Sequence, residues 1–283
     1  MSNDQFFPPY RDLSNAEIET FSANGVAHIP DVVDPAWIPQ LGALIEARQR
    51  TPTERAGDSH PGATQGRSFS DRYLWPTHEG FRAFAFEAGL AGLAGQAMSS
   101  RQIRLYFDHI FTKAPKTEQG TSWHQDLAYW PFRGTQICTI WLTLHDVDLA
   151  TSGWRFIRGS HTWGKWFRPT PLGPQLRWMD ENEAEPIPDF DAQPRRYEQL
   201  SFELKAGDAL IFSPMIVHSA GANQSGNAPR IAFATQWLGD DAVWDPRPGT
   251  DPIVGPQDVA LAPGDLARDS SRFPLVWQQG ASV

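Results

Sequence analysis

The tetrapeptide WHQD at residues 123–126 carries the side chains best suited to chemistry in this sequence. Alternate side chains of a β-strand share one face, so His124 and Asp126 would project to the same side. An imidazole and a carboxylate placed in this way are two thirds of the facial triad that holds non-heme Fe(II) and leaves positions open. A second histidine must come from a distant strand. His218 is the best candidate, because it follows the apolar run 209–212, which is typical of a buried strand.

A histidine–carboxylate pair of this kind is weak evidence alone. With 8 histidines and 33 acidic residues, about one such pair is expected by chance. The alternative for each histidine is a hydrogen-bonded strand residue without a metal. The surrounding features must therefore decide between these two interpretations.

Two further side chains favour a ligand site. Arg230 opens the apolar run 230–238, and it would lie near the metal if its strand were the antiparallel neighbour of the strand with His218. A guanidinium there would suit a distal carboxylate, whereas the alternative is a surface strand arginine. Trp141 could wall an organic ligand, although an aromatic residue in a strand is more often part of the core.

Length and composition limit the classes of protein. The chain has 283 residues, 40% of them hydrophobic, enough for one large β-rich domain or two small ones. The formal net charge of −9 argues against nucleic acid or an anionic membrane as partner. The single cysteine excludes an internal disulfide framework. Without a secretory signal or a membrane-spanning run, we expect a cytoplasmic protein, whose oligomeric state stays open.

The elements that position the site fall into two parts. The pattern over about residues 10–100 predicts a helical layer, which begins with a capping box at Ser14 and Glu17. An exposed loop is expected within it, over 51–70. Residues of about 103–238 predict a β core, and we expect one domain over 1–283. The predicted strands are 103–111, which should be half-buried, 137–144, 154–157, 200–204, 209–212 and 230–238. An insertion or lid over 162–198 and an irregular tail over 239–283 complete the prediction.

Several motifs together resemble one family. The segment 123–133 is similar to the central motif of the phytanoyl-CoA dioxygenase family, and 159–161 resembles its G-S-H turn. Lys113, with Ala-Pro after it, resembles its K-x-P element. The segment 218–230 resembles its distal His–Arg segment. The resemblance runs in the family's order from about residue 10 to 240.

This resemblance implies a double-stranded β-helix, a jelly-roll and cupin-like fold. It also implies oxygenation dependent on Fe(II), 2-oxoglutarate and O2, with release of succinate and CO2. By the same resemblance His124, Asp126 and His218 match the iron ligands, and Arg230 matches the anchor for the distal carboxylate of 2-oxoglutarate.

Other positions follow from the resemblance less directly. Trp141 and His109 fall where the family has further co-substrate contacts, and Arg72 matches a basic contact from its N-terminal segment. The chain departs from the family pattern at Trp154, which follows Gly153 where a second small residue is usual. It also departs at Ala220, where relatives often have serine.

The function hypothesis is a dioxygenase that hydroxylates or otherwise oxidises a small, largely apolar or aromatic molecule. Gln125, Tyr129 and Trp130 should face this substrate, because they lie beside the ligand pair. A CoA thioester is less expected, because the segment 171–193 is acidic on balance. Asp126 favours oxygenation over halide transfer, because related halogenases have a small residue there. The alternatives are a non-catalytic cupin-like metal-binding or sensor protein and an iron oxygenase without 2-oxoglutarate, and Arg230 disfavours both.

Overall fold

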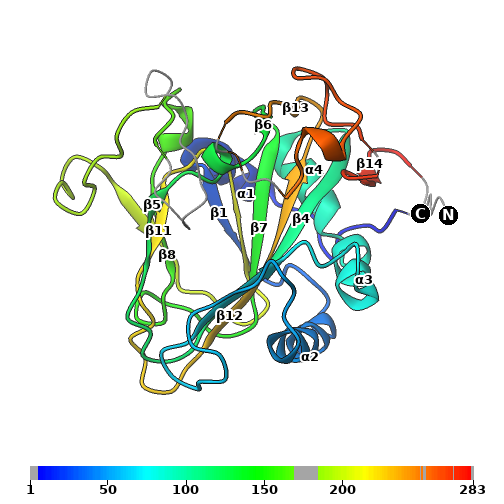
Figure 1. Ribbon diagram of the computed structural model, residues 1–283. Coiled ribbons are helices and arrows are strands. Elements are labelled where there is room, and N and C mark those ends of the chain that lie inside the picture. Colours follow the sequence, from blue (N-terminus) through cyan, green and yellow to red (C-terminus); the bar gives the residue numbers. More distant parts are fainter. Residues whose placement is uncertain (1–5, 169–183, 249, 251–252, 270, 282–283) are drawn as a thin grey trace.

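Two antiparallel sheets face each other in the computed structural model, which describes residues 6–168, 184–248, 250, 253–269 and 271–281 (Figure 1). The larger sheet has the strand order β1-β10-β7-β12-β4-β3-β2, with β14 also paired to β4. Its strands are β1 (Val26–Ile29), β2 (Gly57–Asp58), β3 (Ser68–Arg72), β4 (Gln102–Lys113), β7 (Ile137–Thr143), β10 (Ala209–Phe212), β12 (Arg230–Leu238) and β14 (Leu275–Gln278). This arrangement confirms the predicted mainly β, jelly-roll class.

The smaller sheet carries two of the predicted metal ligands. Its order is β5-β11-β8-β9, with β5 (Thr121–His124), β8 (Trp154–Ile157), β9 (Gln199–Ser201) and β11 (His218–Ala220). The predicted strand 200–204 is shorter in the structure, because Leu204 forms only an isolated bridge with Val147. Three short 3-10 helices also occur, η1 (Asp126–Tyr129), η2 (Ser160–Thr162) and η3 (Pro256–Asp258).

Four helices cover the outer side of the larger sheet (Figure 1). The predicted capping box is present, since the Ser14 hydroxyl accepts the Glu17 amide and the Glu17 carboxylate accepts the Ser14 amide. Two helices rather than one occupy residues 79–98, because Gly89 between them has a φ of 77° and a side chain there would clash with the backbone of Pro8. The helices are α1 (Asn15–Asn24), α2 (Trp37–Arg50), α3 (Glu79–Glu87) and α4 (Leu90–Met98).

The prediction of an exposed loop over 51–70 was correct for most of the segment, which is exposed and irregular, but it missed two short strands. β2 and the start of β3 lie in this segment and extend the larger sheet beyond β4. The polar composition of the segment gave no indication of β3. Asp71 on β3 is fully buried, because the backbone amide and hydroxyl of Thr53 satisfy its carboxylate at 2.9 and 2.5 Å.

The prediction that the strand over 103–111 is half-buried was wrong. Tyr106 and Asp108, expected on an open face, are both buried. The ring of Tyr106 packs on Phe132 and on Phe273 of the tail, with centroid distances of 4.8 and 6.0 Å. The Asp108 carboxylate accepts two backbone amides, from Leu74 and the next residue. Segments distant in sequence therefore cover this face.

The C-terminal tail is more regular than predicted. β13 (Val243–Trp244) pairs with β6 (Phe132–Arg133), and β14 adds to the edge formed by β4, so the run 230–238 is not the last strand. Of the insertion over 162–198, the residues 169–183 lie outside the described part of the chain. No helix among the described residues is long and apolar enough to cross a membrane. The single-domain organisation stays a prediction.

Phe233 joins β12 to the helical layer, and its removal tests that packing. Its ring stacks on Phe81 at 5.6 Å and meets Phe84 edge-on at 5.4 Å. We expect Phe233→Ala to lower the free energy of unfolding by about 3–5 kcal/mol through the cavity it leaves. Urea denaturation would measure this change. Tyr10→Ala is the control, because Tyr10 is 53% exposed, and equal stabilities of the two variants would contradict the packing argument.

Candidate metal centre

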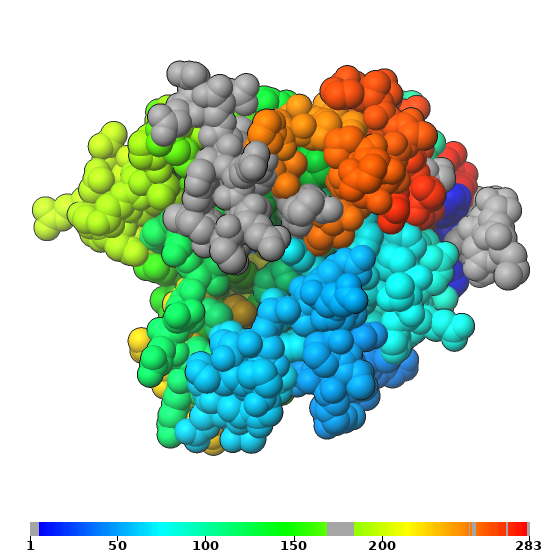
Figure 2. Space-filling view, in the orientation of Figure 1, coloured from blue at the N-terminus to red at the C-terminus, as the bar shows by residue number. Residues whose placement is uncertain are grey.

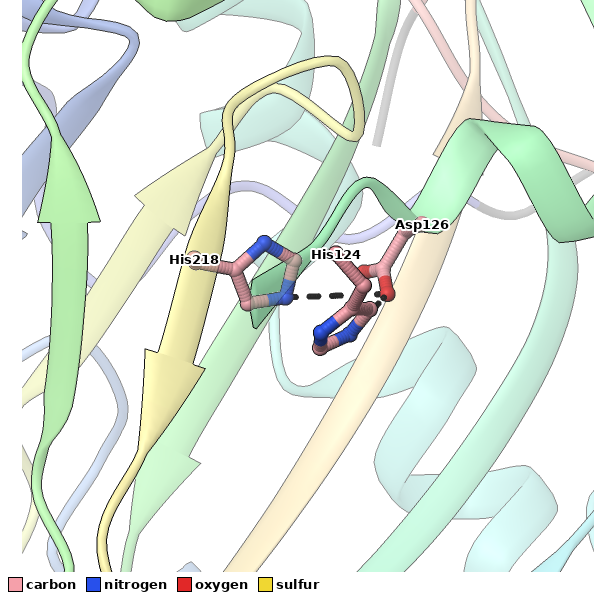
Figure 3. A group of neighbouring side chains, drawn as sticks. All are labelled: His124, Asp126 and His218. Atoms are coloured by element: carbon pink, nitrogen blue, oxygen red, sulfur yellow. Dashed lines mark ion pairs between the residues drawn. The ribbon is translucent and has the colours of Figure 1, made fainter. Parts of the chain in front are cut away.

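Three side chains converge between the two sheets, as Figure 3 shows. His124 ends β5, and His218 begins β11 directly opposite it in the register of the smaller sheet. Asp126 opens η1, two residues after His124, and its Oδ1 lies 3.3 Å from His124 Nε2 and 3.6 Å from His218 Nε2. One ligand atom from each residue falls within 4.8 Å of the others, so the three can bind one metal ion. The site's residues thus come together as the sequence predicted.

The hydrogen bonds of both histidines orient them as metal ligands. Nδ1 of His124 donates to the Ser122 carbonyl at 2.8 Å, and Nδ1 of His218 donates to the Ile216 carbonyl at 2.9 Å. Because a carbonyl only accepts, each ring keeps its proton on Nδ1 and presents the Nε2 lone pair toward Asp126. Each ring thus donates to the backbone carbonyl two residues before its own position.

The charges at the centre also fit a metal. Burial, together with the charge of His124, lowers the pKa of His218 to about 4, so this imidazole is neutral near neutral pH. Burial opposes ionisation of Asp126, but His218 and His124 outweigh it and lower the pKa of this carboxyl. A neutral imidazole and an ionised carboxylate are the forms that bind a divalent cation.

Arg230 lies close to this centre by a different route from the one expected. β11 and β12 belong to different sheets, so they are not neighbours. Aromatic rings lie between Arg230 and the metal ligands. The Arg230 guanidinium lies 5.6 Å from the Trp141 ring and 5.8 Å from the Trp154 ring. The Trp154 ring is in turn 5.1 Å from that of His218. Arg230 is therefore one aromatic ring away from a metal ligand.

The surroundings of Arg230 favour binding of an anion. Only 3% of the residue is exposed, and burial lowers its pKa to about 10, so it stays charged. Its Nη1 donates to the Ser152 carbonyl at 3.1 Å, but its Nε has no partner, and no acidic side chain among the described residues pairs with it. The indole nitrogens of Trp141 and Trp154 are also buried without an acceptor. A carboxylate group fits these donors, and a dicarboxylate could extend from them to the metal centre.

His109 and Arg72 lie on adjacent strands, directly opposite each other in the β3–β4 register. Burial lowers the pKa of His109 to about 3, Arg72 lowers it further, and only Asp126 acts the other way. His109 is thus a neutral imidazole within electrostatic reach of the metal centre. The co-substrate roles of these two residues stay predictions.

The residues predicted to face substrate differ in their surroundings. The Tyr129 ring lies 6.1 Å from that of His124, and Trp130 packs on Phe107 at 5.8 Å. The carboxamide of Gln125 is already engaged: it donates to the carbonyls of Lys165 and Met215 and accepts the Phe167 amide. Gln125 therefore holds the insertion against the metal-binding strand, and its contact with substrate stays a prediction.

The face drawn in Figure 2 is hollowed between the blue-to-cyan N-terminal segment and the green part of the chain. In the same orientation this hollow lies between the two sheets of Figure 1. Sequence reasoning noted Trp154 only as a departure from a pattern, and it gave Ser152 no role. The contacts of Trp154 with both Arg230 and His218 could not be inferred from spacing.

Comparisons with known proteins agree with this geometry. The model of the family Phytanoyl-CoA dioxygenase (PhyH) matches residues 21–232. A probable phytanoyl-CoA dioxygenase of Caenorhabditis elegans is 28% identical over 136 residues, which are 47% of this chain and 41% of that protein. The chain thus matches less than half the length of this relative.

Three solved structures share the fold. The carbocyclase SnoK from nogalamycin biosynthesis has a TM-score of 0.68 at 24% identity, covering 93% of this chain and 96% of that one. The epimerase SnoN with Fe3+, alpha ketoglutarate and nogalamycin RO has a TM-score of 0.67 at 24% identity, with 92% and 97% covered. EctD from S. alaskensis with 2-oxoglutarate and 5-hydroxyectoine has a TM-score of 0.67 at 14% identity, with 93% and 92% covered. From the family match over most of its length, the chain belongs to the phytanoyl-CoA dioxygenase family.

Proposed function

We propose that this protein is an Fe(II)- and 2-oxoglutarate-dependent dioxygenase that oxidises a small organic molecule and releases succinate and CO2. One observation carries the proposal: a three-ligand centre of two imidazoles and a carboxylate lies one ring away from a buried arginine that pairs with no acidic side chain among the described residues. SnoN was solved with Fe3+ and alpha ketoglutarate and EctD with 2-oxoglutarate, which supports the choice of cofactor.

Each residue of the site has a distinct task in this proposal. His124, Asp126 and His218 hold the iron, which together with 2-oxoglutarate supplies the activation of O2. Arg230 binds the distal carboxylate of 2-oxoglutarate. Trp141 and Trp154 keep water from that ion pair, which strengthens the attraction in a medium of low dielectric constant.

The substrate is proposed to be small and largely apolar or aromatic. Tyr129 supplies buried aromatic surface beside His124, Trp130 adds buried aromatic surface next to Phe107, and oriented polar atoms would fix the ligand. The nogalamycin compound in SnoN and the hydroxyectoine in EctD are small molecules, which supports this size class. Turnover of CoA esters but not of free small molecules would contradict this substrate class.

The metal and co-substrate requirement can be tested by titration without oxygen. Fe(II) and 2-oxoglutarate together should produce a visible charge-transfer band that neither produces alone, because the triad leaves positions open for chelation. After chelation of the metal, Fe(II) should restore turnover and Zn(II) should not. Full activity of a zinc-loaded, iron-free protein would rule out the proposed function.

Replacement of Arg230 tests the anchor for the distal carboxylate. We expect Arg230→Met to weaken 2-oxoglutarate binding by about 2–5 kcal/mol while iron stays bound, because one partner of a buried, charged hydrogen bond is lost. Calorimetric titration of the metal-loaded protein would measure the affinity. Arg101→Met is the matched control, because Arg101 is exposed. If both variants bound 2-oxoglutarate like the wild type, another residue would have to be the anchor.

Asp126→Ala tests the carboxylate ligand. Loss of one ligand should weaken iron binding by about tenfold or more and abolish most succinate formation. His124→Ala and His218→Ala should behave similarly, and the effects should not add, because the ligands act as one unit. Asp146→Ala on the exposed surface serves as the control. Wild-type succinate formation by Asp126→Ala, with iron tightly held, would require abandoning the triad.

A further inference from the structure

Lys113 is a second buried cation beside Arg230. The two residues stand directly opposite each other in the antiparallel β4–β12 register, so their side chains leave the sheet on the same face. Only 6% of Lys113 and 3% of Arg230 are exposed. Like charges in this relation repel each other, and burial strengthens the repulsion. The larger sheet therefore tolerates an unfavourable pair at this position.

The groups around Lys113 are polar but carry no negative charge. Its Nζ donates to the Ser152 hydroxyl at 3.0 Å and to the Gly221 carbonyl at 2.8 Å. β3 brings the uncharged Ser68 opposite it, and the segment after β11 brings Asn223, whose amide donates to the Lys113 carbonyl. Burial, and after it the charge of Arg230, lowers the pKa of Lys113 to about 7. In the described part of the chain, no acid contributes to that pKa.

Ser152 connects the two cations. Its hydroxyl accepts from Lys113 and donates to the Gly221 carbonyl at 2.5 Å, while its own carbonyl accepts from Arg230. Ser152 is fully buried and has a φ of 72°, a left-handed conformation that a non-glycine residue needs contacts to maintain. Lys113 therefore fixes the turn that orients Arg230. Through Gly221 it also holds the segment that follows the ligand His218.

We propose that Lys113 is a positioning residue for the co-substrate: it orients Arg230 through Ser152 and adds a second positive charge toward the distal carboxylate of a 2-oxo dicarboxylic acid. This inference rests on the proposed function. A carboxylate bound at Arg230 would relieve the repulsion between the two cations. Binding of a dicarboxylate would therefore offset the unfavourable free energy of burying these two cations.

The inference also sets the direction of the pH dependence. A bound carboxylate favours the charged form of Lys113 and raises its pKa above the ligand-free value of about 7. The affinity for the dicarboxylate is then highest at pH values below the ligand-free pKa of Lys113. It falls as the pH rises above this pKa, because binding must then be accompanied by uptake of a proton. Arg230 keeps its charge throughout this range.

The test compares two oxo acids that share a chelating end. 2-Oxoglutarate has a distal carboxylate and 2-oxobutyrate has none, and both would be titrated by calorimetry into the Fe(II)-loaded protein without oxygen. Lys113→Met should bind 2-oxoglutarate about tenfold or more weakly and 2-oxobutyrate within about twofold of the wild type. Lys116→Met, which changes an exposed lysine in the loop that follows β4, should bind both like the wild type.

Two further measurements separate positioning from loss of structure. Across pH values of about 6.5 to 8.5, the wild-type affinity for 2-oxoglutarate should fall, and the affinity of Lys113→Met should change less. The melting temperature of ligand-free Lys113→Met should not drop, because a repulsion is removed and the Ser152–Gly221 hydrogen bond remains. Both results together would support a role in binding.

Equal 2-oxoglutarate affinity of Lys113→Met and wild type would overturn the inference and leave the proposed function intact. Equal weakening of both oxo acids would also overturn it, because Lys113 would then act on the metal end or on the fold. A wild-type protein that does not bind 2-oxoglutarate at all would instead overturn the proposed function, and this inference with it.

Discussion

The alternation of side chains at residues 123–126 is the constraint on which the rest of the site depends. His124 and Asp126 point to the metal centre, whereas the residues between and before them point to the insertion. Trp123 donates from its indole to Asp191, and Gln125 binds the backbone of Phe167. One short segment therefore supplies two metal ligands and two of the contacts that hold the insertion. A shift of one residue in its register would exchange the two faces and destroy both functions.

The site separates charge along its length. The metal end has one carboxylate and two imidazoles whose Nε2 atoms face it, so it attracts a cation. The far end has Arg230 and Lys113, both buried without an acidic partner among the described residues, so it attracts an anion. Trp154 lies between them and contacts both Arg230 and His218. A ligand with a chelating group at one end and a carboxylate at the other matches both ends at once.

The sequence predicted the parts of this arrangement that depend on local pattern. The His124–Asp126 pair, the apolar runs and the Ser14 capping box each follow from spacing over a few residues. His218 and Arg230 were selected from their positions beside apolar runs, and the family resemblance supported both. The role of Lys113 depends on its position opposite Arg230 in β12, more than a hundred residues later, and no local pattern indicates that register. The strand β3 was missed for a similar reason, because its polar sequence resembles a loop and its pairing with β4 depends on residues distant in sequence.

The strand β4 explains why the site can hold unfavourable charges in place. It carries both His109 and Lys113, it pairs with β12 over its length, and its two faces are covered. Helix α4 packs on β4, Tyr106 is covered by Phe273 of the tail, and the Asp108 carboxylate is held by the backbone amide of Leu74. A strand fixed from both faces cannot turn a buried lysine toward water. The surplus of positive charge therefore stays buried at the site, where a bound anion would neutralise it.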